Sequence, residues 1–283
     1  MNHHCMFCEL RMLENLLNMH QLPDEIKEKT AREFFSYFSQ LPENILSPQV
    51  ARDIHVRIKK LTGISDPYKE LKQKCNTMML EMLPELRDRV SSSPDPFITA
   101  LKLAIAGNII DFAKSTDFNI YGTIERVLNS SFAIDHSAQL RSGINKAATV
   151  LYIGDNAGEI VLDRLFLEQL NHPGIIFAVR NEPILNDATT DDAIAAGIPQ
   201  FAKVISTGSN APSAILSEVS AEFSQIYNSA SLIISKGQGN LEGLIDEKDK
   251  NIFFMLMIKC DHIAGLLKVK TGDYVIKNNR NTI

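Results

Sequence analysis

Two polar segments in the second half of the sequence contain residue types suited to binding a divalent cation. Asp155 and Asn156 follow the apolar run 150–153, and Asp187 closes a polar segment that follows the apolar run 175–179. Carboxylate and amide oxygens are the ligands that Mg²⁺ or Mn²⁺ prefers, and such a set leaves positions for water and substrate oxygens. Asp155, Asn156 and Asp187 are therefore the candidate metal ligands.

A third polar segment, Ser235-Lys236-Gly237-Gln238-Gly239-Asn240, follows another apolar run. Its backbone N–H groups, at Gly237, Gly239 and Asn240, and the Lys236 ammonium suit a phosphate bridged to the same metal. Asp155 or Asp187 would then either activate the attacking water or attack phosphorus directly to give an aspartyl-phosphate, and the sequence leaves both routes open. The segment lacks the spacing of a Walker loop, and the stretch from Gly154 to Gly158 lacks the full dinucleotide-binding pattern.

Each of these residues also has a purely structural interpretation. An Asp or Asn after a strand is often a helix N-cap, and two glycines in a loop often mark a turn that needs positive φ. Asp191 and Asp192 are interpreted as first-turn charges that favour a helix dipole. The occurrence of three polar segments at successive strand ends favours a functional site, because parallel strands bring their carboxyl ends to one edge of a sheet.

The elements that must position these residues form a βαβ pattern from Ala147 onward, where short apolar runs alternate with helical periodicity. This predicts a mostly parallel sheet in a Rossmann-like α/β/α domain over residues 146–283. The predicted strands are Thr149 to Ile153, Ile175 to Val179, Lys203 to Ser206, Leu232 to Ser235 and Phe253 to Ile258. The predicted helices follow Asp155, span Asp191 to Ala196 and Ser213 to Phe223, and follow Gly239.

Residues 1–145 show apolar positions at a period near 3.6, which predicts a separate helical bundle domain. A long helix is expected from Tyr68 to Val90, and Pro96 is expected to open the next one. At the other end of the chain, Gly272 to Ile276 is expected to form a short edge strand. The polar tail from Lys277 to Ile283 is expected to fray.

Composition excludes several classes of function. The chain has 283 residues, 45% of them hydrophobic, and a formal net charge of −5. It therefore lacks the basic footprint of a nucleic-acid binder and is not suited to anionic membranes. The N-terminus has no signal-peptide pattern and no apolar run approaches the length of a membrane span, so a cytoplasmic location is expected.

Four cysteines in a chain of this length are not a disulfide framework. Cys5 and Cys8 form a C-x-x-C pair that, with His3, His4 and Cys75, could bind a soft metal or oxidise as a dithiol. The sequence has no second C-x-x-C, and packing of Cys8 against the helical bundle is an equal alternative. Cys75 and Cys260 lie among apolar residues and are expected to be buried small hydrophobes.

Four motifs in this order resemble the damage-control phosphatases, also called ARMT-like proteins or domain of unknown function eighty-nine. They are Gly107-Asn108-Ile109-Ile110-Asp111-Phe112, Gly154-Asp155-Asn156-Ala157-Gly158-Glu159, the Pro183 to Ala188 segment, and Ser235 to Asn240. The similarity spans nearly the whole chain. The Cys5–Cys8 pair resembles the one that marks the prokaryotic branch of this family.

The resemblance implies a metal-dependent phosphatase with an N-terminal helical bundle and a C-terminal Rossmann-like domain. Carried over residue by residue, it places the metal ligands at Asp155, Asn156 and Asp187 and the phosphate-binding lysine at Lys236. Asn108 and Asp111 would line the cleft from the helical domain. Glu159, one helical turn beyond Asp155, would lie near the metal.

The expected activity is hydrolysis of phosphomonoesters of small metabolites, such as sugar phosphates or phosphopantetheine-like compounds, with a role in metabolite damage control. The expected cofactor is a divalent cation, Mg²⁺, Mn²⁺, Co²⁺ or Ni²⁺. An alternative enzyme class is an S-adenosylmethionine-dependent carboxyl methyltransferase, because a glycine-containing turn after the first strand also suits a nucleotide cofactor. A third interpretation is a non-enzymatic metal- or redox-linked binding module centred on the C-x-x-C.

Overall fold

The computed structural model describes residues 1–20, 22–107 and 120–281. Within these residues the centre of the molecule is a mixed sheet with strand order β1-β7-β6-β5-β2-β3-β4. Neighbouring strands pair in parallel except β6 and β7, which are antiparallel. The strands are β1 (Ile134–Asp135), β2 (Val150–Ile153), β3 (Ile175–Val179), β4 (Lys203–Ser206), β5 (Leu232–Lys236), β6 (Ile252–Met257) and β7 (Tyr274–Asn278).

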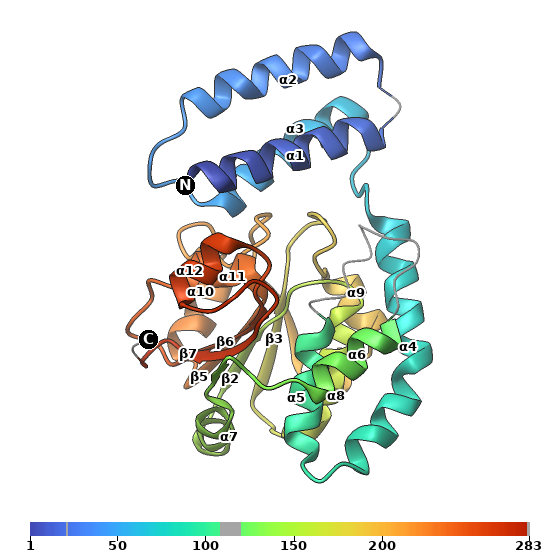
Figure 1. The fold of residues 1–283 in the computed structure, drawn as a ribbon, viewed down its shortest axis with the longest axis vertical. Coiled ribbons are helices and arrows are strands. Elements are labelled where there is room, and N and C mark those ends of the chain that lie inside the picture. Colours follow the sequence, from blue (N-terminus) through green and yellow to red (C-terminus); the bar gives the residue numbers. More distant parts are fainter. Residues whose placement is uncertain (21, 108–119, 282–283) are drawn as a thin grey trace.

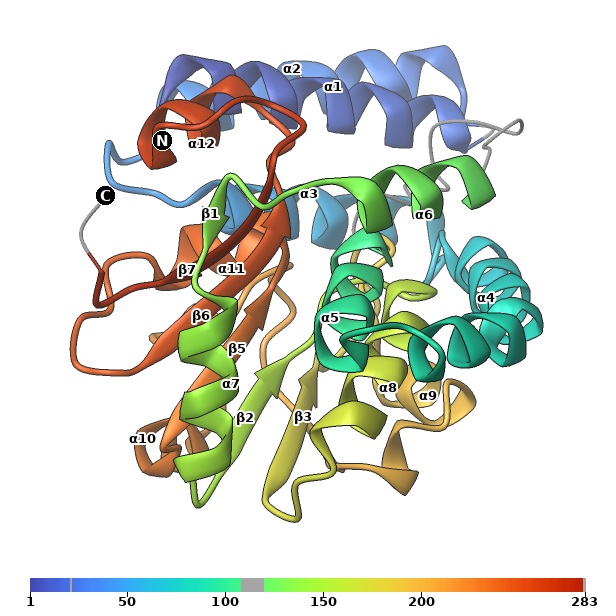
Figure 2. The same cartoon turned by 60° about the horizontal axis from the view of Figure 1, so that its bottom comes forward.

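Helices cover both faces of this sheet (Figures 1 and 2). One hydrophobic core joins it to α4–α9 and the other joins it to α10–α12. The helices are α1 (His3–Met19), α2 (Asp24–Ser39), α3 (Ser47–Thr62), α4 (Lys69–Ser91), α5 (Pro96–Gly107), α6 (Ile120–Asn129), α7 (Ser137–Lys146), α8 (Glu159–Leu170), α9 (Thr190–Ala195), α10 (Ala221–Ser229), α11 (Gly237–Leu244) and α12 (Asp261–Leu267). The predicted Rossmann-like α/β/α architecture with a mostly parallel sheet is confirmed.

Strand β2 explains why the central sequence is a continuous apolar run. Its four residues are completely buried, with Val150 and Tyr152 in one core and Leu151 and Ile153 in the other. A parallel strand that is covered on both faces needs apolar side chains at every position. This central position fixes the point where the chain leaves the sheet and the polar residues begin.

Helices α1 to α3 have a third core of their own, built around Leu16, Val50 and Ile54. Figure 1 shows them as a layer across one end of the α/β layers, with the start of α1 beside α12. Helices α4 to α7, by contrast, share the core of the sheet. The predicted domain boundary near residue 145 therefore does not coincide with a boundary between hydrophobic cores.

Several predicted elements need correction. The two-residue strand β1 lies inside the segment that was expected to be entirely helical, and α12 was not predicted. Helix α10 begins at Ala221 instead of Ser213, because the Ser220 hydroxyl accepts a hydrogen bond from the Phe223 N–H at 3.1 Å and so caps the helix there. The predicted long helix over Tyr68 to Val90 is confirmed as α4.

The C-terminal segment is also a larger part of the sheet than predicted. Strand β7 lies between β1 and β6, so it is not an edge strand. Lys277 and Asn278, expected to fray, belong to this strand and are 5% and 6% exposed. The short strand β1, which has no strong sequence signal, covers its outer side.

No helix in the described ranges is long and apolar enough to cross a lipid bilayer.

Candidate metal and phosphate site

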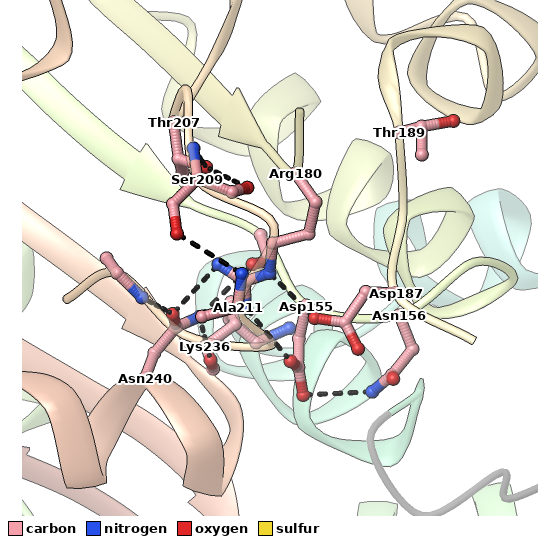
Figure 3. Close-up of polar contacts among 12 residues, drawn as sticks. Asp155, Asn156, Arg180, Asp187, Thr189, Thr207, Ser209, Ala211, Lys236 and Asn240 are labelled. Atoms are coloured by element: carbon pink, nitrogen blue, oxygen red, sulfur yellow. Dashed lines mark hydrogen bonds and ion pairs between the residues drawn. The ribbon is translucent and has the colours of Figure 1, made fainter. Parts of the chain in front are cut away.

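The candidate metal ligands lie where β2, β3 and β5 end at the same edge of the sheet. Beyond β2, the Ala157 N–H donates to the Asn186 carbonyl at 2.9 Å and the Ala188 N–H donates to the Asp155 carbonyl at 2.8 Å. These bonds hold Asn156 and Asp187 opposite each other in an isolated antiparallel bridge. Figure 3 shows Asp155, Asn156 and Asp187 side by side. The structure thus brings together all three predicted ligands.

Glu159 joins them from the first turn of α8. The Asn156 amide nitrogen donates to Asp155 Oδ2 and to Glu159 Oε2, both at 2.9 Å. Asp155, Asp187 and Glu159 are 8%, 3% and 1% exposed. Burial, together with the charges of Glu159 and Asp187, raises the pKa of the Asp155 carboxyl above its usual range. Negative charge therefore accumulates in a poorly hydrated place.

Arg180, which follows β3, is a buried cation that contacts both Asp155 and Asp187. Its Nε donates to Asp187 Oδ2 at 2.7 Å, its Nη2 lies 3.6 Å from Asp155 Oδ1, and its Nη1 donates to Asn240 Oδ1 at 3.1 Å. It is 1% exposed. Arg180 was assigned no role from the sequence, although a charged residue directly after a buried strand is a usable signal. One guanidinium is shared by two of the three carboxylates.

Asn240 has a structural role in this arrangement. Its amide nitrogen donates to the carbonyls of Gly154 and Lys236, and its oxygen accepts from Arg180 and from the Ala214 N–H. These four bonds use the full hydrogen-bonding capacity of a side-chain amide. The Asn240 side chain therefore ties together the ends of β2, β3 and β5, and a substrate contact of this residue stays a prediction.

Lys236 was expected in an open glycine-rich loop, and the structure places it as the last residue of β5, completely buried. Its ammonium donates to the Ala104 carbonyl at 2.9 Å, contacts Asp163 and lies 2.8 Å from Glu159 Oε1. Burial lowers its pKa, but Asp163 and Glu159 more than offset this, so the pKa is raised. Lys236 therefore serves as the counter-ion of two buried carboxylates.

The predicted glycine-rich loop is in fact the first turn of α11. At Gly237 the backbone has φ +78°, and a Cβ atom there would lie 1.9 Å from Asp155 Oδ2. At Gly239 a Cβ would lie 2.3 Å from the Pro212 carbonyl oxygen. These glycines allow α11 to begin directly against the Asp155 carboxylate, which no larger residue would permit.

The residues present fit a divalent cation. Among the described residues, no three His, Cys, Asp or Glu side chains form a ready ligand group. The amide of Asn156 therefore has to complete a set with Asp155 and Asp187. Such an all-oxygen set suits a hard cation. Burial raises the pKa of the Asp155 and Asp187 carboxyls, and a bound cation would favour their ionised form.

Lys259, at the end of β6, is a residue that sequence reasoning missed. Its side chain is exposed, and its charge lowers the pKa of both Asp155 and Asp187, which places it at the same edge of the sheet. It differs from Lys236 in facing solvent. Asp163, also missed, lies one helical turn after Glu159, and that spacing was the available signal. The predicted Asn108 and Asp111 lie outside the described residues.

A family model described as the damage-control phosphatase ARMT1-like domain matches residues 1–275. The chain belongs to this ARMT1-like family. An uncharacterized protein from Methanocaldococcus jannaschii is 42% identical to it over 234 residues, covering 79% of this chain and 77% of the relative. A damage-control phosphatase from Pyrococcus horikoshii is 35% identical over 242 residues, covering 84% and 83%.

A third relative in the ARMT1-like family, named damage-control phosphatase, comes from Archaeoglobus fulgidus and is 31% identical, with 82% of each chain covered. The crystal structure of a DUF89 family protein from Pyrococcus horikoshii superposes with a TM-score of 0.88 at 32% identity, covering 99% of both chains. Family membership and the relatives' names support a phosphatase activity for this chain.

Proposed function

We propose that this protein is a metal-dependent phosphatase that hydrolyses phosphomonoesters of small metabolites, with a role in metabolite damage control. The proposed metal requirement rests on one observation. The isolated β-bridge between Asn156 and Asp187 sets these two residues beside Asp155 at the edge of the sheet. Asp155 and Asp187 are both buried and, with the amide oxygen of Asn156, offer an all-oxygen set of donors, which supports binding of a divalent cation.

Asp155, Asn156 and Asp187 would hold the cation, which when bound supplies neutralisation of charge on a phosphate oxygen. Mg²⁺, Mn²⁺, Co²⁺ and Ni²⁺ all suit oxygen ligands with open positions. Arg180 orients the two aspartates through a hydrogen bond to Asp187 and an ion pair with Asp155. The chain thereby preorganises charges before substrate binds, which is the main source of catalysis in phosphoryl transfer.

Two lysines, Lys259 and Lys236, have different roles in the proposed site. Lys259 is exposed at the site edge and can bind a phosphate oxygen as a point charge. Lys236 keeps Glu159 and Asp163 paired behind the ligands and so fixes the wall of the site. A phosphate contact by Lys236, expected from the family resemblance, would require its ammonium to leave these partners.

The attacking group is either a water molecule oriented by Asp155 or Asp187, or one of these carboxylates. In the first route the P–O bond to the leaving group breaks as the water oxygen bonds to phosphorus and the carboxylate takes the proton. In the second route an aspartyl-phosphate forms and is then hydrolysed. Hydroxylamine trapping during turnover separates the routes, because only an acyl-phosphate gives a hydroxamate.

The test is a screen of phosphate release over sugar phosphates, phosphopantetheine-like compounds and other phosphorylated metabolites, with each of the four cations. We expect no turnover after chelation and recovery on adding metal. Undiminished phosphate release by metal-free protein would contradict the proposal. Calorimetry with S-adenosylmethionine tests the methyltransferase alternative in parallel, since a methyltransferase would bind it and release no phosphate.

A further inference from the structure

A second group of ligand-type side chains lies where α1 meets α11 and the start of α12, and the proposed phosphatase chemistry uses none of them. We call Cys5, Cys8, Glu9, Glu242 and Cys260 the thiol cluster. The first three come from α1, Glu242 comes from α11, and Cys260 precedes the first residue of α12. Figures 1 and 2 both place the start of α1 beside α12.

Helical spacing places Cys5 and Glu9 on one face of α1, since they are four residues apart. The pKa of the Cys5 thiol is raised to about 11, first by burial and then by Glu242, Cys260, Cys8 and Glu9 in that order. Each of these neighbours is a potential anion. Cys260, which is 255 residues away in sequence, therefore lies near Cys5 in the structure.

Gln238 connects the two members that come from the α/β layers. Its amide nitrogen lies 3.3 Å from Cys260 Sγ and 3.4 Å from Glu242 Oε1, and its oxygen accepts from the Lys259 N–H at 3.2 Å. These bonds hold Cys260 and Glu242 next to each other, close to the start of α1 (Figure 1). Cys260 packs against the hydrophobic core of α10–α12, as expected, but it is half-buried instead of buried.

The Glu9 carboxylate gives independent evidence for a bound ligand at the thiol cluster. It is only 7% exposed, and its Oε2 has no hydrogen-bond partner among the described residues, while its Oε1 accepts from the Ser47 hydroxyl. A buried carboxylate oxygen without a partner is unfavourable unless a cation or a donor satisfies it. Burial, and to a smaller extent the charge of Glu242, raise the pKa of Glu9, so the two carboxyls lie near each other.

We propose that Cys5, Cys8 and Cys260, with a carboxylate of Glu9 or Glu242 as the fourth ligand, form a binding site for Zn²⁺ or a similar thiophilic cation. Thiolates select this class of metal, and four donors complete its tetrahedral shell. The site is separate from the oxygen cluster at Asp155 and does not depend on the phosphatase proposal.

The donors of the thiol cluster are not yet gathered at ligand distances in the described structure. Protonated thiols have no reason to converge, whereas metal binding deprotonates them and draws them together. Cys8 is exposed, so a change of its rotamer does not disturb a packed core. A bound cation would join the α1–α3 layer to the α/β layers, because its ligands come from both.

Cys75, the third cysteine considered from sequence, is 3% exposed within α4 and belongs to neither α1 nor α12. Cys75 is therefore the matched control for the cysteines of the thiol cluster.

The experiment titrates the reduced, full-length protein with Co²⁺, whose charge-transfer absorption reports thiolate ligands. Zn²⁺ is then added to displace the Co²⁺. We expect a thiolate band that Zn²⁺ abolishes. Cys75→Ser should keep this band in full, and so should Asp187→Asn, which weakens only the oxygen site.

Cys260→Ser and Cys8→Ser should each lower the zinc affinity by at least roughly tenfold and weaken the band, because even changes behind a metal ligand cost about 10- to 100-fold. Circular dichroism checks folding, and Cys8→Ser at an exposed position should fold normally. The proposal is overturned if the native protein shows no thiolate band, or if folded Cys260→Ser and Cys8→Ser keep it at full strength.

Discussion

Asp187 lies next to Asn156 through the backbone and bonds to Arg180 through its side chain, so a change of its charge tests the candidate metal site directly. Asp187→Asn keeps the size of the side chain and an oxygen that can accept from Arg180. It removes one of two anionic ligands, and we expect turnover to fall by at least about a hundredfold with much weaker metal binding. Asp191→Asn, at an exposed position in α9, is the control. Near-normal turnover and metal affinity in Asp187→Asn would reduce Asp187 to a structural residue.

Substitutions of Lys236 and Lys259 should affect different properties of the protein, namely stability and substrate binding. Lys236→Met leaves Glu159 and Asp163 buried without their cation, and breaking a buried pair in this way costs about 3–5 kcal/mol of stability. Lys259→Met, at an exposed position, should leave stability unchanged and raise the KM for phosphorylated substrate. Urea unfolding and steady-state kinetics measure the two effects. If folded Lys236→Met had the same free energy of unfolding as the native protein, the ion pairs of Lys236 would contribute little to stability.

The start of α11 is an element whose position depends on glycine. Gly237→Ala would put a methyl group into the Asp155 carboxylate, whereas at Gly63, with a similar φ of +70°, a Cβ meets nothing within 4 Å. Both changes carry the backbone cost of a left-handed alanine, about 1–2 kcal/mol. Only Gly237→Ala should also lower metal affinity and turnover, by at least roughly tenfold. Equal effects of the two variants on metal binding, measured by calorimetry, would show that α11 does not support the site.

The stability of the whole molecule should depend on pH through His55, a buried residue of α3. Burial, then Lys59 and His20, lower its pKa from 6.5 to about 4. Between these values the unfolded chain binds the proton and the folded chain does not, so stability is lost as the pH falls from about 6.5 towards 4. The full effect is about 3 kcal/mol.

Glu9 and Glu242 change the stability in the opposite direction, since burial raises the pKa of each from 4.5 to about 7. Their contribution to the free energy of unfolding is fully present below pH 4.5 and is lost as the pH rises through about 7. The His55 effect is therefore measured as the difference between native protein and His55→Leu in urea unfolding across this range. A difference that does not change with pH would show that His55 titrates alike in both states.

The sequence alone determined the α/β class, the positions of β2, β3 and β4, and the grouping of Asp155, Asn156 and Asp187 at one sheet edge. These follow from short-range patterns, because an apolar run marks a buried strand and parallel strands must end together. Only the tertiary structure decided that Lys236 is buried, that β7 is an inner strand and that Cys260 lies near Cys5. Each of these depends on a partner far away in sequence: Asp163 for Lys236, β1 for β7 and α1 for Cys260. Burial and charge pairing are properties of packed elements, so no local pattern encodes them.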